Sequence, residues 1–78
     1  MNTMKMIRDL NALGGDAALS EDGRCVFLSA ENGDNLADYY GEFTGGDMWI
    51  APKVLEIAAR HGGFVEWENA GCLSIWEA

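Results

Sequence analysis

Two of the three Gly-Gly pairs in this chain, Gly14-Gly15 and Gly62-Gly63, each follow a stretch with helical spacing. Glycine adopts the positive φ angles that end a helix without steric cost. Before the first pair, Thr3–Leu13 repeats apolar residues at spacings of four and three, which predicts an amphipathic helix. Before the second, Pro52–His61 begins with a proline suited to a first helical turn, so we predict a second helix there. Its expected apolar stripe is Val54, Leu55 and Ala58, with Ile57 beside it.

A β-hairpin is predicted after each helix. In the first, the turn Glu21-Asp22-Gly23 joins Ala17–Ser20 to Arg24–Ala30, because Asp-Gly tolerates positive φ. The strand Arg24–Ala30 carries apolar side chains on both faces, so we expect it to be central. In the second hairpin, Phe64–Glu77, the chain turns at Asn69-Ala70-Gly71. Alternation places Val65, Trp67, Leu73 and Ile75 toward the helices, and Glu66, Glu68, Cys72, Ser74 and Trp76 on the opposite face.

The segment Glu31–Gly46 permits more than one structure. Leu36, Tyr39 and Tyr40 fit one helical turn capped by Asp34, whereas Tyr39–Phe43 fits a short edge strand. The glycines that follow favour a loop. The predicted fold is therefore α+β: one domain over residues 1–78, with two helices packed on a small antiparallel sheet built from two hairpins. Its order is α-β-β, a loop or short helix, then α-β-β.

No pattern in the chain indicates catalysis. The two cysteines form no disulfide framework, and His61 is the only histidine. P-loop, GxGxxG, HExxH and GxSxG motifs are absent. We therefore expect no enzyme activity, no cofactor, and no catalytic or metal-ligating residues. The N-terminal residues lack the apolar core of a signal peptide, and no apolar run approaches the ~18 residues of a membrane span. We expect a cytoplasmic protein that binds neither membranes nor nucleic acid directly.

The acidic residues are concentrated in one part of the chain. Residues 16–47 carry eight carboxylates and one base, Arg24, within a chain of net charge −8. Such a charge repels phosphates and favours a basic partner, although solubility alone can explain an acidic surface. Aromatic residues interleave with these acids, and such rings either cover a core or anchor an interface. The candidate partner-binding residues are Glu21, Asp22, Glu31, Asp34, Asp38, Glu42, Asp47, Glu66, Glu68, Tyr39 and Tyr40.

Glu66 and Glu68 suggest how such a surface can imitate nucleic acid. Residues two apart on a strand share a face at a spacing of ~6.6 Å. Two phosphate steps along one DNA strand advance ~6.8 Å. A strand with acids on one face can therefore present charges at the spacing of a phosphate backbone, to a groove lined by Lys and Arg.

A small, acidic, folded and motif-free chain resembles the phage-encoded anti-CRISPR proteins, several of which mimic DNA and block type I Cascade complexes. The segments ADYYGEFTGGDMWIAP and HGGFVEWENAGCLSIWEA are similar to sequences of small phage proteins. Among anti-CRISPR proteins, the chain resembles inhibitors of the type I-C system. These families share no motif, so the acidic candidate residues come from the charge argument and not from the resemblance. The resemblance implies an inhibitor that blocks binding of double-stranded DNA to Cascade. The alternative is an acidic interaction module, antitoxin-like or accessory, that masks a basic partner without DNA mimicry.

Overall fold

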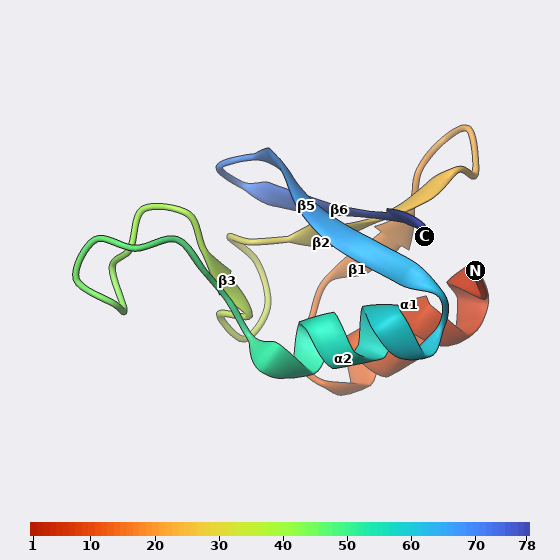
Figure 1. Cartoon of the computed structure of the whole chain (residues 1–78), viewed down its shortest axis with the longest axis horizontal. Coiled ribbons are helices and arrows are strands. Elements are labelled where there is room, and N and C mark those ends of the chain that lie inside the picture. The colour runs from red at the N-terminus through yellow and green to blue at the C-terminus, as the bar shows by residue number, and fades with distance from the viewer.

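Two helices lie side by side under one face of a four-stranded antiparallel sheet, and a two-stranded ribbon extends from one end (Figure 1). The computed structural model describes all of residues 1–78. The helices are α1 (Thr3–Ala12) and α2 (Pro52–Arg60). The sheet has the order β1-β2-β6-β5, with strands β1 (Ala17–Leu19), β2 (Cys25–Ser29), β5 (Gly63–Asn69) and β6 (Cys72–Glu77). This confirms the predicted α+β fold with two helices and two hairpins.

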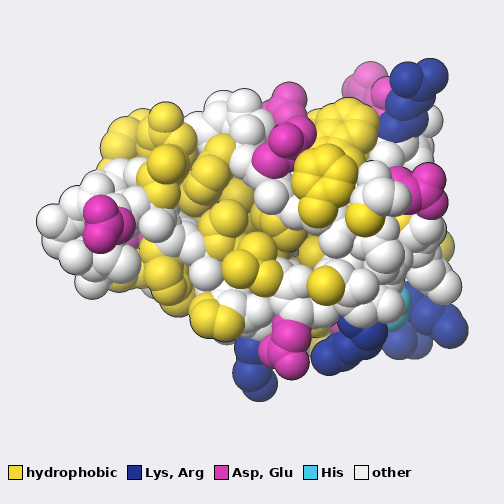
Figure 2. Space-filling view, in the orientation of Figure 1, with side chains coloured by type: hydrophobic (Ala, Val, Ile, Leu, Met, Phe, Trp, Pro, Cys, Tyr) yellow, Lys and Arg dark blue, Asp and Glu magenta, His cyan; other side chains and the backbone are white.

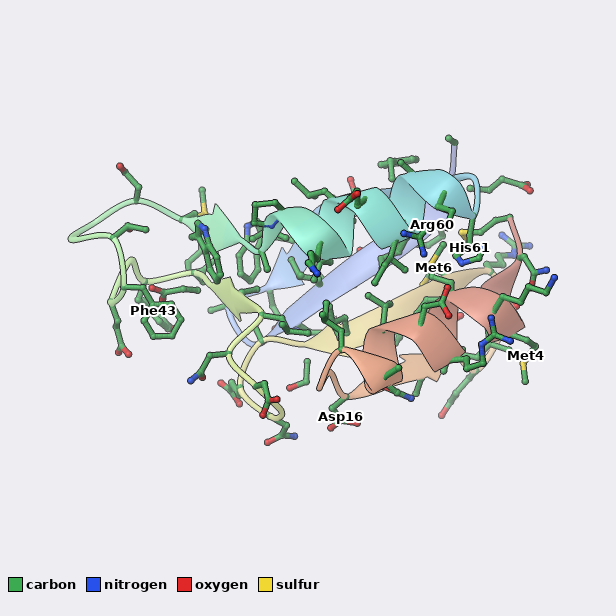
Figure 3. All side chains as sticks on the ribbon, turned by 90° about the horizontal axis from the view of Figure 1, so that it is seen from below. Met4, Met6, Asp16, Phe43, Arg60 and His61 are labelled. Carbon is green, nitrogen blue, oxygen red and sulfur yellow. The ribbon has the colours of Figure 1, made fainter.

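Helix α1 begins and ends where the sequence predicts, to within one residue. The side chain of Asn2 caps it by accepting the Lys5 backbone N–H at 3.2 Å. Met6 and Leu10 are fully buried against the sheet, whereas Met4 points away from it and is 70% exposed (Figure 3). After the helix, Gly14 adopts a φ of 100°. A side chain there would also collide with Asp34, so only glycine fits this position.

Helix α2 buries the expected apolar stripe with the exception of Leu55. Pro52 occupies its first turn as predicted. Val54, Ile57 and Ala58 are buried, at the helical spacings of three and four. Leu55, which follows Val54 in the sequence, is 46% exposed, so the prediction that it belongs to the apolar stripe was wrong.

The hydrophobic core lies between the helices and the sheet. Val26 and Leu28 of β2 pair with Ile75 and Leu73 of β6, and all four side chains are buried. Helix α1 packs against β1 and β2, whereas α2 packs against β5. Strand β2 is central, and the alternation predicted for the second hairpin is confirmed by the pairing of Val65 with Ile75. Both hairpin turns project away from the helices (Figure 1).

The segment 31–46 contains neither the helical turn nor the Tyr39–Phe43 strand that the sequence suggested. Its regular structure is β3 (Ala37–Asp38), which pairs with β4 (Trp49–Ile50) as a separate ribbon. The remainder is loop, as the glycines predicted. Between the two short strands, residues 39–48 form a loop that protrudes from the end of the molecule (Figure 1).

None of the helices is both long and apolar enough to cross a membrane.

Candidate functional site

Charge is separated between the two layers of the fold. The helices contain four of the five bases, Lys5, Arg8, Lys53 and Arg60, and only two of the 13 acids, Asp9 and Glu56. The helices therefore carry a net charge of +2, and the sheet and loops together carry −10. Figure 2 shows most Lys and Arg side chains along the edge formed by the helices, with acids over the sheet and the protruding loop. The acid-rich residues 16–47 thus lie outside the two helices, which contain four of the five bases.

The face of the sheet opposite the helices is uncovered. We call it the open sheet face, and it carries Cys25, Phe27, Phe64, Glu66, Glu68, Cys72, Ser74 and Trp76. The Trp76 indole N–H donates to Ser74 Oγ at 3.0 Å, so the ring lies along its own strand above the buried serine. Phe27 and Trp76 are half-buried, and Phe64 is 47% exposed. Aromatic rings therefore form part of a surface that no other element of the chain covers.

Two hollows adjoin Trp76 on this face. The first, which we call the Trp76 hollow, has a volume of about 470 Å³ and is open to solvent. Phe27 and Trp76 contribute rings to it, and Glu21, Asp22 and Glu68 contribute carboxylates. Neither Glu21 nor Glu68 forms an ion pair or a side-chain hydrogen bond within the chain. No basic residue lines this hollow, so the carboxylates of Glu21 and Glu68 are available to a cation.

The second hollow, of about 560 Å³, lies on the other side of Trp76. Phe64, Glu66, Glu77 and Arg24 line it. The Arg24 side chain is 78% exposed, and its Nε is 3.9 Å from Asp22 Oδ2. This hollow therefore already contains a guanidinium group of the chain itself, whereas the Trp76 hollow does not.

The turn of the first hairpin holds Asp22 in a fixed position. Asp22 Oδ1 accepts the Ser20 hydroxyl at 2.7 Å and the Arg24 backbone N–H at 3.1 Å. The same hydroxyl accepts the Cys25 backbone N–H. The hydrogen bond from Ser20, followed by that from Arg24, lowers the pKa of Asp22 below its usual value. Asp22 is therefore ionised and oriented at neutral pH, at the rim of the Trp76 hollow.

A third hollow, of about 320 Å³, lies at the opposite end of the molecule. Glu31, Glu42, Tyr39 and Tyr40 line it. The Tyr39 ring contacts those of Tyr40 and Trp67 edge-to-face, at centroid distances of 5.4 and 5.3 Å. Tyr40 is 71% exposed, whereas Tyr39 is 39% exposed. Tyr39 therefore joins the loop to the sheet, and Tyr40 remains accessible to a partner.

Asp38 has a structural role that the sequence did not predict. Its side chain is only 8% exposed, and its Oδ2 accepts the Phe43 backbone N–H at 2.7 Å. The loop narrows where Gly41 contacts Gly46, and the backbone N–H groups of Gly45 and Gly46 both donate to the Gly41 carbonyl. Loop 39–48 is thus held by its own hydrogen bonds. Asp38 is used internally, and we leave it out of the proposed contact surface.

The candidate acids form two groups at opposite ends of the molecule. Glu21, Asp22, Glu66 and Glu68 meet around Trp76, although they come from both hairpins. Glu31 and Glu42 meet at the base of the protruding loop, and Asp47 is exposed within that loop. Asp34 stands apart, packed against Gly14. Sequence reasoning did not include Phe27 or Phe64 among the candidates, although strand alternation places both on the same face as Trp76.

The side chains that often carry chemistry are occupied or dispersed. His61 Nε2 is 2.8 Å from Asp9 Oδ2, where the end of α2 faces α1 (Figure 3). Cys25 is buried, and burial raises the pKa of the Cys72 thiol, which makes it a poor nucleophile. No three His, Cys, Asp or Glu side chains are grouped so that they could hold a metal ion.

Comparisons with protein-family models, with curated proteins and with solved structures gave no match for this chain.

Proposed function

We propose that this protein is an acidic inhibitor that binds the basic groove of a nucleic-acid-binding complex and blocks access of double-stranded DNA. The observation that carries the proposal is the separation of charge, −10 on the sheet and loops against +2 on the helices. A groove that binds DNA is lined by Lys and Arg, which attract phosphates and release counterions on binding. A protein face with exposed carboxylates is attracted to the same Lys and Arg side chains by the same electrostatic interaction.

Type I Cascade, and the I-C complex first, is the partner to test. The sequence resembles inhibitors of this system, and Glu66 and Glu68 of β5 both lie beside Trp76 on the open sheet face, which supports this choice. A β-bulge follows Trp67, so the spacing between Glu66 and Glu68 differs from that of a regular strand. We therefore base the proposed imitation of phosphates on all the carboxylates of the open sheet face and not on this pair alone.

The test is a competition assay with purified type I-C Cascade, labelled target double-stranded DNA and this protein. We expect the protein to bind Cascade and to prevent DNA binding, with weaker inhibition as the salt concentration rises. The variant E21K/E66K/E68K reverses three acids beside Trp76 and should abolish inhibition. The double variant E66K/E68K should also lose inhibition. Its matched control D16K/E56K makes the same change in net charge at two exposed acids outside the candidate set, and should inhibit far more strongly.

Either of two results would refute the proposal. One is undiminished DNA binding by Cascade in the presence of excess protein. The other is full inhibition by a folded E21K/E66K/E68K variant, with folding checked by circular dichroism.

The alternative function is masking of a basic partner without DNA mimicry. The aromatic rings of Phe27 and Trp76 beside the carboxylates favour it, because such rings are common anchors of protein interfaces and have no counterpart in a phosphate backbone. The two functions differ in whether binding excludes DNA. Stable association of the protein with Cascade while DNA remains bound would favour masking.

A further inference from the structure

The Trp76 hollow combines an aromatic surface with carboxylates, of which Glu21 and Glu68 have no partner within the chain whereas Asp22 lies 3.9 Å from Arg24. This combination selects among basic side chains. Its rings come from Phe27 and Trp76, and its carboxylates from Glu21, Asp22 and Glu68. A cation placed against an indole face is attracted by the ring as well as by the acids. The hollow is therefore more than a region of negative charge.

Guanidinium matches this arrangement better than ammonium does. The planar Arg group stacks on aromatic rings and donates in parallel to carboxylate oxygens, whereas the Lys ammonium is compact and strongly hydrated. The neighbouring hollow is lined by the chain's own Arg24 together with Phe64, Glu66 and Trp76. The Nε atom of Arg24 lies 3.9 Å from Asp22 Oδ2, where the two hollows adjoin, so a guanidinium is already present beside one of these carboxylates.

The position of the hollow indicates how a partner would reach it. The hollow lies on the open sheet face, between the turn of the first hairpin and β5. Both hairpin turns project on this side of the sheet, away from the helices (Figure 1). Its walls therefore come from two separate hairpins, and a side chain can enter from the uncovered side.

We propose that the Trp76 hollow binds an arginine side chain of the partner protein, in preference to lysine. This deepens the proposed function by naming the residue that the open sheet face recognises, but it can be tested without Cascade. A second copy of this chain is the competing occupant. Its exposed bases are mostly Lys and Arg of the helices, and its net charge of −8 opposes self-association.

The test is an NMR titration of the ¹⁵N-labelled protein with hexa-arginine and with hexa-lysine, which carry equal side-chain charge. The indole N–H signal of Trp76, assigned with a Trp76→Phe variant, is the readout. We expect hexa-arginine to shift this signal and to bind at least about fivefold more tightly than hexa-lysine. The E21Q/E68Q variant should lose most of that preference, whereas the control E42Q/D47Q, with the same change in charge, should retain it.

Three results would overturn the inference. They are equal affinity for the two peptides, a Trp76 signal that does not respond to hexa-arginine, or an equal loss of preference in E42Q/D47Q. A Trp76 signal that shifts with protein concentration in the absence of peptide would assign the hollow to a second copy. Because no DNA or Cascade is present, arginine binding can succeed while Cascade inhibition fails, and the reverse.

Discussion

At the scale of single residues, Asp9 connects the two helices through one carboxylate. Its Oδ2 lies 2.8 Å from His61 Nε2 and 3.8 Å from an Arg60 nitrogen, and its Oδ1 lies 3.3 Å from Arg8. The hydrogen bond with His61, supported by Arg8, lowers the pKa of Asp9 below its ordinary 3.8 despite partial desolvation.

This lowered pKa predicts a pH-dependent contribution to stability. A carboxylate with a lower pKa in the folded state stabilises the fold above its unfolded pKa, and the contribution disappears as pH falls through the folded value. We expect the melting temperature of the wild type to exceed that of Asp9→Asn near neutral pH. The difference should shrink once the pH falls below the ordinary value of 3.8. Thermal melts of both proteins across this range measure it, and a difference that stays constant would contradict the prediction.

Single residues also show where sequence reasoning is limited. Asp38 and Asp47 are both acids in a glycine-rich segment, yet the first is buried and the second exposed. The difference arises because Asp38 lies in β3, where its carboxylate can reach the Phe43 backbone N–H. A side chain-to-backbone contact of this kind depends on the loop path, and no residue pattern encodes it.

At the scale of elements, the helices and hairpins could be predicted and the ribbon could not. Thr3–Ala12 and Gly63–Asn69 are long enough for a helical or an alternating period to be visible. Strands β3 and β4 have two residues each and pair across the intervening loop, so they contain no measurable period. In the same way, sequence identified the acids of each hairpin, but their meeting around Trp76 follows from the pairing of β2 with β6.

Loop 39–48 provides a test of how its shape is maintained. Gly41 and Gly45 both have positive φ, 72° and 81°, which strains any other residue. A Cβ at Gly41 would lie 2.4 Å from the Gly46 carbonyl carbon, whereas a Cβ at Gly45 would meet no atom within 4 Å. We therefore expect Gly41→Ala to lower the melting temperature more than Gly45→Ala and to shift the Phe43 amide signal. Equal effects of the two substitutions would show that the Gly41–Gly46 contact is unimportant.

The two tyrosines of this loop should respond differently to truncation. Tyr39 contacts Tyr40 and Trp67, so Tyr39→Ala should lower the melting temperature. Tyr40 is 71% exposed, so Tyr40→Ala should leave stability nearly unchanged and weaken Cascade binding by more than ~1 kcal/mol if the ring is an interface anchor. Leu55→Ala is the control for Cascade binding: it removes an exposed apolar side chain from α2 and should leave binding unchanged. Unchanged Cascade binding by Tyr40→Ala would remove Tyr40 from the interface.

At the scale of the whole molecule, the separation of charge would orient the protein toward the basic partner that we propose. The acidic sheet and loops would then face the basic surface, and the helices, at +2, would face away from it. We expect Cascade binding to weaken about tenfold or more between ~50 and ~200 mM salt. The E21K/E66K/E68K variant should retain little of this salt dependence. Affinity that is independent of salt would exclude an electrostatic interface.

If the protein replaces DNA in a binding groove, as we propose, its length limits how much DNA one copy can replace. Its longest dimension is 34 Å, and base pairs advance ~3.4 Å along the DNA axis. A copy lying lengthwise in a DNA-binding groove therefore has a footprint of about ten base pairs, roughly one helical turn. A partner that holds a longer duplex would have room for a second copy. The number of copies bound per complex would then report the length of DNA path that must be covered to prevent binding.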